Sequence, residues 1–591
     1  MFRVLIVAAL SVVFAIVGGH NVFGQPTRAP DMSFLPVHKA AMGVTQKGTE
    51  IPVWLPRDLH KLQTDALRIL IIGGMDGSPD SVRYVKHLLK PFEAKELPEK
   101  GGANGVYEIA FIPNVFPDGL PDDLMPSDLS RGFPPSSGFY NASSRPEAAY
   151  LWRWVGMYGA HLVIDVRVGK QNGYWGNKKL LADAIKAGLF RGPPDVFLPD
   201  PPEDDFIRKL SAVKVEDLPP TASVIMQVPK DWKETDPELP LVTMHYAGVI
   251  ESPARAELLR LQNQSAESLI HELTSVYGHD LRQVAYIPAL AVIGRLRAAE
   301  HFSDDKEKKS LAELLQPFRS GKRTPIPKSG SDQAGHLLFA EMAKRSEGKD
   351  RERWIELCRV AADQIFDKDG KPKDLMPYHN EMSDAVFMAT PILCATGKLT
   401  GEKKYFDAAV THFRNMKKLC LREDGIFRHS PLDEAAWGRG NGFPALGLGW
   451  ALSEFPEDHP AFPELKADFQ NHIRALLKHQ DQFGCWHQVI DKPGSYREFS
   501  ATCMIGWALK RGIDRGWLDK EHYQPALDRA WLAAKQRIHD KGVVVDICTG
   551  TGKQKLLRDY YDRPAIWGVD ARGGAMALMF ATEMLEEPRT K

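Results

Sequence analysis

Two aspartates, Asp332 and Asp384, stand near the starts of helix-like segments in "SGSDQAGHLL" and "NEMSDAVFM". Two nearby carboxyl groups can share the work of an acid and a base, because one charge raises the pKa of the other group. Such an acid gives a proton to a substrate and then takes one from water, so its pKa should lie near the working pH. Aspartate is also a favoured helix cap, and each residue taken alone is better explained that way.

A second candidate is the stretch "DEAAWGRGNGFPALGLGW", residues 433–450. Its glycines let the backbone come close to a ligand or to a neighbouring helix. An indole offers a flat apolar face to a sugar ring, and a guanidinium can bind a carboxylate through two hydrogen bonds. We expect Trp437 and Arg439 to project from the lip of a binding site. The alternative is a helix start in which Trp437 fills the core and Arg439 pairs with Asp433 or Glu434.

The elements that must position these residues are helices. From about residue 265 onward the apolar residues recur with a period of 3.6, and Gly, Pro or Asp clusters separate the segments. Eleven or twelve helices with loops of alternating length suggest paired helices in a closed ring, with the Gly-rich loops at one end. The expected helices lie near 284–300, 307–318, 332–346, 351–366, 383–396, 402–420, 440–454, 462–479, 499–512, 523–540 and 570–586.

The N-terminal half has a different pattern, in which short apolar runs alternate with amphipathic segments. This alternation predicts an α/β domain with a largely parallel sheet. The segment 190–240 is dense in Pro, Asp and Glu, and we expect it to be a long excursion or surface loop. The expected strands are 66–74, 106–115, 160–168 and 240–249, and the expected helices are "PDSVRYVKHLLKPF" and "RPEAAYLWRWVGMYG".

The C-terminal half resembles the unsaturated rhamnogalacturonyl hydrolases, glycoside hydrolase family 105, which are relatives of the unsaturated glucuronyl hydrolases. The segments that carry the resemblance occur in the family's order, over about residues 280–590. The resemblance implies an (α/α)6 barrel, here assigned to 263–591, which agrees with the helix count. The segments are "GSDQAGHLLFAEMAKRSEGKDRERW", "HNEMSDAVFMATPILCATGKLTGEKKYFDAAVTHF", "GIFRHSPLDEAAWGRGNG", "GCWHQVIDKPGSYREFSATCMIGWALKRGI" and "GVVVDICTGTG".

The resemblance also implies an activity. Polysaccharide lyases leave a 4,5-unsaturated uronic acid at the non-reducing end of an oligosaccharide. An enzyme of this kind protonates C4 and adds water at C5, and the resulting hemiketal rearranges and releases the rest of the saccharide. No cofactor or metal is implied.

Residue by residue, Asp384 matches the family's acid/base and Asp332 its supporting aspartate. The remaining matches imply a substrate-binding set of His379, His429, Trp437, Arg439, Phe443 and His487. For His379 and His487 the alternative is a surface or hydrogen-bonding role. Two departures affect the expected sugar pocket: Met382 stands where an aromatic residue is common, and Phe443 where tryptophan is common.

Residues 30–262 resemble the core of a zinc metallocarboxypeptidase, through "LRILIIGGMDGSPDS", "AFIPNVFPDG", "RPEAAYLWRWV" and "HLVIDVRVGKQ". The family's metal ligands fall on Asp76, Pro79 and Arg167. Proline offers no ligand and arginine is a cation, so these residues cannot build a zinc site from imidazoles and a carboxylate. We expect a non-catalytic domain with a peptidase-like fold and no metal. Asp76 and Asp80 could bind another cation, but aspartate is commoner as a turn residue.

The first residues, "MFRVLIVAALSVVFAIVGG", have the order of a secretory signal peptide with a cleavage site near Gly24. Residues 1–25 are therefore expected to be removed on export to the periplasm or the extracellular space, with no stable membrane insertion afterwards. A retained membrane anchor is the alternative. Lys+Arg and Asp+Glu are both 76, so no global charge indicates a nucleic acid partner. Nothing in the sequence specifies an oligomeric state.

Three functions stay open on the sequence. The first is an exported hydrolase for oligosaccharides with an unsaturated galacturonyl or glucuronyl end. The second is a catalytically inactive carbohydrate-binding or scaffold protein. The third is an ordinary inverting glycosidase on saturated sugars, which also needs two carboxyl groups.

Overall fold

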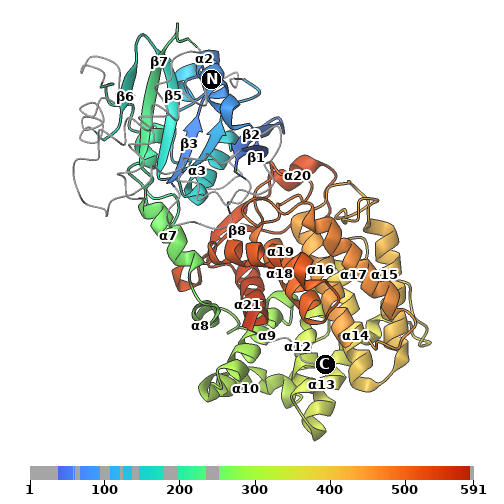
Figure 1. Ribbon diagram of the computed structural model, residues 1–591. Coiled ribbons are helices and arrows are strands. Elements are labelled where there is room, and N and C mark those ends of the chain that lie inside the picture. Colours follow the sequence, from blue (N-terminus) through green and yellow to red (C-terminus); the bar gives the residue numbers. More distant parts are fainter. Residues whose placement is uncertain are drawn as a thin grey trace. The chain divides into compact units, whose positions relative to one another are not determined.

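The computed structural model describes residues 37–56, 59, 67–93, 107–119, 124–135, 145–177, 197–233 and 252–585. The expected signal peptide and the expected strand at 240–249 lie outside these ranges. The contacts divide the chain into two compact units, residues 1–260 and residues 261–591 (Figure 1).

The first unit is built on a mixed sheet in the strand order β1-β2-β4-β3-β5-β7-β6. The pairings β3–β4, β3–β5 and β5–β7 are parallel, and β1–β2, β2–β4 and β6–β7 are antiparallel. The α/β character is as predicted, but a largely parallel sheet is wrong, because a hairpin and a short edge strand extend the parallel centre. The strands are β1 (His38–Val44), β2 (Glu50–Leu55), β3 (Leu67–Ile72), β4 (Tyr107–Ile112), β5 (Leu162–Gly169), β6 (Gly173–Trp175) and β7 (Ser223–Pro229).

The two predicted helices of this unit are present as α2 (Pro79–Leu89) and α3 (Pro146–Tyr158). The prediction of a surface excursion over 190–240 is wrong for its middle part, where α5 (Phe206–Leu210) precedes the buried strand β7. The strand was overlooked because proline and acidic residues flank its apolar run, "SVIMQV", on both sides. The helix α7 (Pro253–Gln262) follows, and its Leu258 packs on Met157 and Leu218.

The second unit is an (α/α)6 barrel. Each inner helix packs on the next, and the last one packs back on the first, so the ring is closed. The inner helices are α9 (Tyr286–His301), α11 (Gly330–Gly335) with α12 (Leu337–Lys344), α14 (Ala385–Thr400), α16 (Gly438–Glu454), α18 (Phe499–Asp514) and α21 (Ala571–Leu585). The outer helices are α8 (Ala266–Val276), α10 (Asp305–Arg319), α13 (Gly348–Ala362), α15 (Lys403–Cys420), α17 (Phe462–Leu477) and α19 (Lys520–Lys535).

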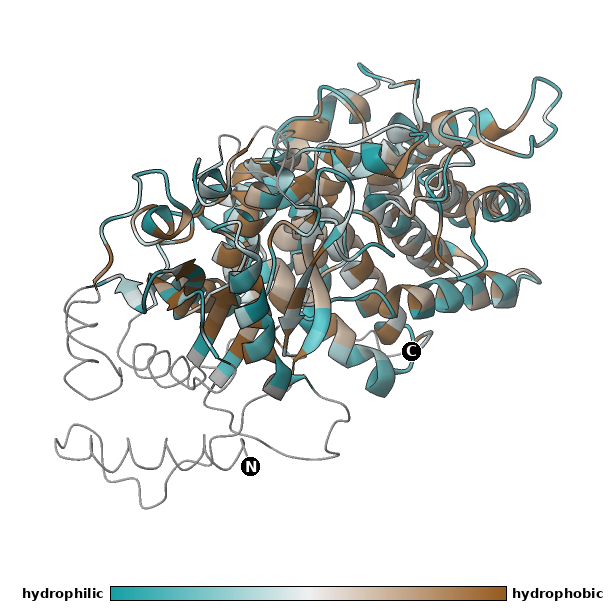
Figure 2. Cartoon of the chain, turned by 90° about the horizontal axis from the view of Figure 1, so that it is seen from above, coloured by the Kyte–Doolittle hydropathy of each residue, from teal (hydrophilic) through white to brown (hydrophobic). Residues whose placement is uncertain are grey.

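Burial explains which helices lie inside. The inner helices α14 and α16 are buried along almost their whole length, and their sequences are apolar or glycine-rich on all sides. The outer helix α15 buries one stripe and exposes Lys and Arg on the other, as an amphipathic surface helix does. In Figure 2 the strands carry long brown stretches, whereas many helices alternate brown and teal. All eleven helical ranges predicted from the period are helical; α8 is the twelfth.

The remaining elements of the barrel unit are short. A two-stranded sheet of β8 (Val544–Cys548) and β9 (Ala565–Gly568) precedes α21, with α20 (Leu557–Tyr561) between the strands. All six cysteines are buried free thiols. Within the described ranges, no helix combines the length and the hydropathy needed to cross a bilayer.

Candidate active site

The first residues of the inner helices meet at one end of the barrel. The side chain of Tyr286, the first residue of α9, is close enough to Asp384, Arg439, Arg572 and Glu498 for all four charges to act on its hydroxyl, while burial raises its pKa. These residues belong to the starts of α14, α16, α21 and α18. Helix N-termini carry partial positive charge, so this end of the barrel favours anions.

Asp384 does not act as a helix cap. Its backbone is already helical and its side chain makes no capping hydrogen bond. Instead its Oδ2 lies 3.3 Å from Nε2 of His429. Burial raises the pKa of Asp384, but the imidazoles of His429 and His379 outweigh it, and the net pKa lies below the ordinary value. The direction of this shift is opposite to the one expected from a neighbouring carboxylate, because imidazoles face the group.

His429 is fully buried and connects three elements. Its Nδ1 lies 3.0 Å from the hydroxyl of Tyr560 in α20, and its ring centroid lies 4.6 Å from that of Trp437. The backbone carbonyl of His429 accepts a hydrogen bond from the N–H of Ser383. His429 therefore holds the residue that precedes Asp384 and the carboxyl group itself. Tyr560 was not among the predicted site residues.

Asp332 lies in the first turn of α11 and its carboxylate is used locally. Ser329 caps the helix by accepting a hydrogen bond from the N–H of Asp332. One oxygen of Asp332 accepts from Nε2 of Gln283 at 3.0 Å and the other accepts from the N–H of Lys328 at 3.1 Å. Among the contacts of the described residues, none joins Asp332 to Asp384. Its supporting role stays a prediction.

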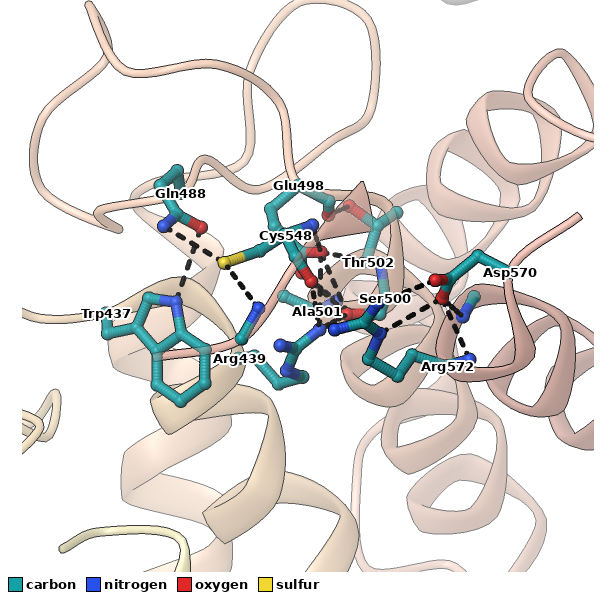
Figure 3. A network of polar contacts seen from close by, with 12 residues as sticks. Trp437, Arg439, Gln488, Glu498, Ser500, Ala501, Thr502, Cys548, Asp570 and Arg572 are labelled. Carbon is teal, nitrogen blue, oxygen red and sulfur yellow. Dashed lines mark hydrogen bonds and ion pairs between the residues drawn. The ribbon is translucent and has the colours of Figure 1, made fainter. Parts of the chain in front are cut away.

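Trp437 and Arg439 are buried, so the prediction that they project from a lip is wrong. Each is only 2% exposed. The indole Nε1 of Trp437 donates to Gln488 at 3.3 Å, and the guanidinium of Arg439 lies 5.0 Å from the indole ring (Figure 3). A side chain on Gly438 would come within 2.4 Å of the carbonyl oxygen of His487, so glycine permits this tight packing.

Arg439 does not pair with Asp433 or Glu434 among the described contacts. Its Nη1 donates to Ser500 Oγ at 3.1 Å and to the carbonyl of Cys548 at 3.0 Å. Burial alone would lower the pKa of Arg439. The nearby Cys548, Tyr286 and Glu498 groups raise this pKa by more than burial lowers it, so the net shift is upward. The guanidinium is therefore a fixed positive charge inside the barrel.

Glu498 holds this arrangement together. It caps α18 and is fully buried. Its carboxylate accepts hydrogen bonds from Ser500 Oγ at 2.8 Å, from the N–H of Ala501 at 2.6 Å and from the N–H of Cys548 at 3.0 Å. Nη1 of Arg439 lies 3.9 Å away. These donors fix the carboxylate, so Glu498 orients Arg439 partly through Ser500.

The other predicted binding residues have mixed placements. The ring of Phe443 is buried and packs edge-to-face on Tyr286, with centroids 5.5 Å apart. His379 is half-buried, has a left-handed backbone with φ 54°, and is near enough to lower the pKa of Asp384. The ring of His487 makes contacts near its own loop: its Nε2 lies 3.4 Å from Asp481, and its Nδ1 lies 2.5 Å from the carbonyl of Ser495.

Sequence reasoning missed Tyr286, Glu498 and Arg572. Each stands at or just before the start of an inner helix. A ring of inner helices brings all of their starts to one end, so polar residues at these positions were the available signal.

The three residues that the peptidase resemblance assigned to metal ligands make local contacts in the first unit. Pro79 begins α2, and Asp76 accepts hydrogen bonds from the N–H groups of Ser78 and Val168. Arg167 donates to Asp165 at 2.8 Å and to Asp205 at 2.9 Å. In the part of the chain that the structure describes, no three His, Cys, Asp or Glu side chains are grouped so as to hold a metal ion.

The fold and this arrangement define an (α/α)6 barrel with a buried carboxylate, imidazoles and arginines at the N-terminal ends of its inner helices. The sequence profile of Glycosyl Hydrolase Family 88 matches residues 262–587. The chain belongs to this family.

Two characterised relatives are similar to part of the chain. The unsaturated rhamnogalacturonyl hydrolase YesR of Bacillus subtilis is 26% identical over 212 residues, which is 34% of this chain and 59% of that protein. The unsaturated 3S-rhamnoglycuronyl hydrolase of Formosa agariphila is 28% identical over 179 residues, which is 27% of this chain and 48% of that protein. The chain thus spans about half the length of these relatives.

Solved structures resemble the chain more distantly. A family 105 glycoside hydrolase of Clostridium acetobutylicum has a TM-score of 0.47 and 20% identity, over 54% of this chain and 99% of that one. The unsaturated glucuronyl hydrolase of Bacillus sp. GL1 has a TM-score of 0.39 and 15% identity, over 56% of this chain and 95% of that one.

Proposed function

We propose that this chain is an exported glycoside hydrolase that hydrates the 4,5 double bond of an unsaturated uronic acid at the non-reducing end of lyase-generated oligosaccharides. The observation that carries the proposal is the buried pair of Asp384 and His429, in which the carboxyl group faces an imidazole instead of capping its helix. The family membership and the named activities of the two relatives support the same reaction.

In the proposed reaction Asp384 acts twice. Oδ2 of Asp384 lies 3.3 Å from Nε2 of His429. A bound anionic substrate raises the pKa of the carboxyl group, because a like charge disfavours ionisation. The protonated Asp384 then gives its proton to C4. The resulting carboxylate takes a proton from water as that water adds to C5, which restores the acid. The hemiketal rearranges and releases the leaving saccharide.

His429 has a positioning role in this proposal. Its Nδ1 contact with the hydroxyl of Tyr560 fixes the ring, so Nε2 stays directed at Asp384. The fixed ring keeps the carboxyl group of Asp384 in place while the charge of a bound substrate raises the proton affinity of that group.

The test is the loss of alkene absorbance when the purified full-length protein is added to unsaturated disaccharides. Substrates made with pectin lyases and with glycosaminoglycan lyases separate the galacturonyl and glucuronyl preferences. Loss of absorbance on one of these series supports the proposal. Cleavage of only saturated analogues would instead indicate an ordinary glycosidase, and absence of any turnover would indicate a binding protein. Fractionation of the producing cells tests export.

A further inference from the structure

A second arginine, Arg572, belongs to the same end of the barrel and has no predicted role. It lies in the first turn of α21, and its side chain is 27% exposed. Asp570 accepts hydrogen bonds from its Nε at 3.2 Å and from its Nη2 at 2.8 Å. This pairing fixes one edge of the guanidinium (Figure 3). Nη1 has no hydrogen-bond partner among the described residues.

Arg439 is fixed in the same way, with one free end. Its Nη1 is used by Ser500 and Cys548, whereas its Nη2 has no hydrogen-bond partner in the described part of the chain. The free ends of the two arginines converge on Gly550. A methyl group at the α-carbon of Gly550 would lie 3.4 Å from Arg439 Nη2 and 3.7 Å from Arg572 Nη1.

Two guanidinium groups directed at one point repel each other unless a negative charge lies between them. Glu498 and Asp570 lie on the other sides of the two groups, so they orient the arginines without occupying this point. A carboxylate there would accept charge-assisted hydrogen bonds from both guanidinium groups. The hydroxyl of Tyr286, which also has no hydrogen-bond partner among the described residues, lies within electrostatic reach of both arginines and of Asp384.

We propose that Arg572 and Arg439 together bind the carboxylate of the substrate's uronic acid, in a space kept open by Gly550. The inference rests on the proposed function and adds the residue that selects for a free acid. Both arginines and Asp384 act on the same hydroxyl of Tyr286, so a carboxylate bound here lies at the same end of the barrel as Asp384, and its negative charge would disfavour ionisation of that group.

The test compares an unsaturated uronyl disaccharide with its methyl ester, which removes the charge and keeps the ring. Calorimetry measures binding of both ligands to the full-length wild type and to Arg572→Gln. We expect Arg572→Gln to weaken binding of the free acid by about 10-fold to 100-fold, the range of one charge-assisted hydrogen bond. The affinity for the ester should change by less than about 3-fold, because the ester carries no negative charge that could pair with Arg572.

Arg558→Gln is the matched control. Arg558 of α20 forms an ion pair of 2.7 Å with Asp562, the residue after that helix, so its loss also removes one pair of an arginine with an aspartate from the segment that precedes α21. It should leave both ligands bound as in the wild type. Equal weakening of acid and ester by Arg572→Gln, or no weakening of the acid, would overturn the inference.

The loop offers a second, independent test. Gly550→Ala should weaken binding of the acid more than that of the ester, because the methyl group enters the space between the arginines. Gly552→Ala lies in the same loop, where an added methyl group meets nothing within 4 Å, and should change neither. If Gly550→Ala weakens both ligands equally, the glycine serves only its backbone conformation, which has φ 104°, and the open space is not a binding site.

The failures of the two proposals are distinguishable. Turnover of the disaccharide with identical effects of Arg572→Gln on acid and ester would retain the hydrolase and overturn the paired arginines. Selective binding of the acid without turnover would retain the paired arginines and overturn the hydrolase. If the wild type neither binds nor turns over any unsaturated disaccharide, both are overturned.

Discussion

Both units place an arginine beside buried carboxylates, and they differ in what the arginine leaves unused. In the first unit Arg167 is held between Asp165 and Asp205, and Asp76 beside it is used by backbone N–H groups. In the barrel, Arg439 and Arg572 each direct at the same space one N–H end that has no hydrogen-bond partner among the described residues. In the first cluster the arginine lies between two carboxylates, so its charge is already balanced and the expected role is to stabilise the fold. The second is incomplete without an anion, which is the property that a binding site requires.

The largest effect should follow from removing the acid. Asp384→Asn keeps the shape of the side chain but cannot cycle a proton, so turnover of an unsaturated disaccharide should fall by about 10²–10⁴-fold. Loss of alkene absorbance measures the rate, and circular dichroism checks the fold. Asp165→Asn in the first unit is the control and should leave turnover unchanged. A variant of Asp384 with nearly full activity would mean that another group supplies the proton.

The next effect concerns the cluster of Arg167, Asp165 and Asp205 in the first unit. Arg167→Met leaves Asp165 and Asp205 buried without a counter-ion, which typically costs about 3–5 kcal/mol. Hydrogen exchange of the full-length protein should show this loss in β5 and β7. Arg208→Met removes a solvent-exposed pair with Glu203 and should cost about 0–1 kcal/mol. Unchanged protection in Arg167→Met would show that the cluster does not stabilise the first unit.

A pH effect of opposite sign in the two units sharpens the comparison. Burial raises the pKa of Asp165 to about 7, because two buried carboxylates share one guanidinium and Oδ1 has no hydrogen-bond partner among the described residues. The folded state then holds a proton that the unfolded state releases, so stability falls as the pH rises from about 4 through 7. From pH 5 to pH 8 the contribution should fall by about 2–3 kcal/mol. Asp165→Asn should remove this part of the pH dependence, measured by hydrogen exchange at β5.

In the barrel the corresponding group is His412 of α15, fully buried behind the start of α14. Its Nδ1 accepts from the N–H of Met376 and its Nε2 lies 3.1 Å from the carbonyl of Ala385. Burial lowers its pKa to about 4. The neutral ring stabilises the fold above about pH 6.5, and this contribution is lost as the pH falls toward 4. About 2 kcal/mol should be lost between pH 7 and pH 5. Exchange at α14 in the wild type and in His412→Gln measures it; parallel curves would contradict the assignment.

The helices of the barrel were predictable because apolar periodicity is a local property, written within each segment of 15 or so residues. Asp384 was singled out in another way, by its place in an ordered set of segments that resembles a family, because its own segment alone indicates a helix cap. Its environment was not predictable, because His429 comes from a loop 45 residues later and Tyr560 from another element. Arg572 was missed for a related reason. Nothing in its own segment indicates that ring closure directs its free end at Gly550.

The exposure of Trp437 and Arg439 was predicted wrongly for a different reason. A glycine-rich turn indicates close approach of the backbone, but it does not say whether a ligand or another part of the chain approaches. Here the segment that approaches the glycine-rich turn is part of the protein itself, namely the loop that contains His487 and Gln488. The strand β7 was missed because its flanking residues have the composition of a loop. The short apolar run between them was the signal for a strand.

The closure of the inner ring has a consequence for how the protein is made. The helix α21 packs against α8 and α9, so the two ends of the barrel unit meet only after nearly all of it has been synthesised. Arg572 enters with that helix. A growing chain that has reached α18 already contains Asp384, His429 and Arg439, but its ring has a gap and half of the proposed anion site is absent. The ability to bind substrate should therefore arise only when α21 packs on α8 and α9, which is the final long-range step of folding. A ligand that holds both arginines would slow the opening of that last helix more than that of any other.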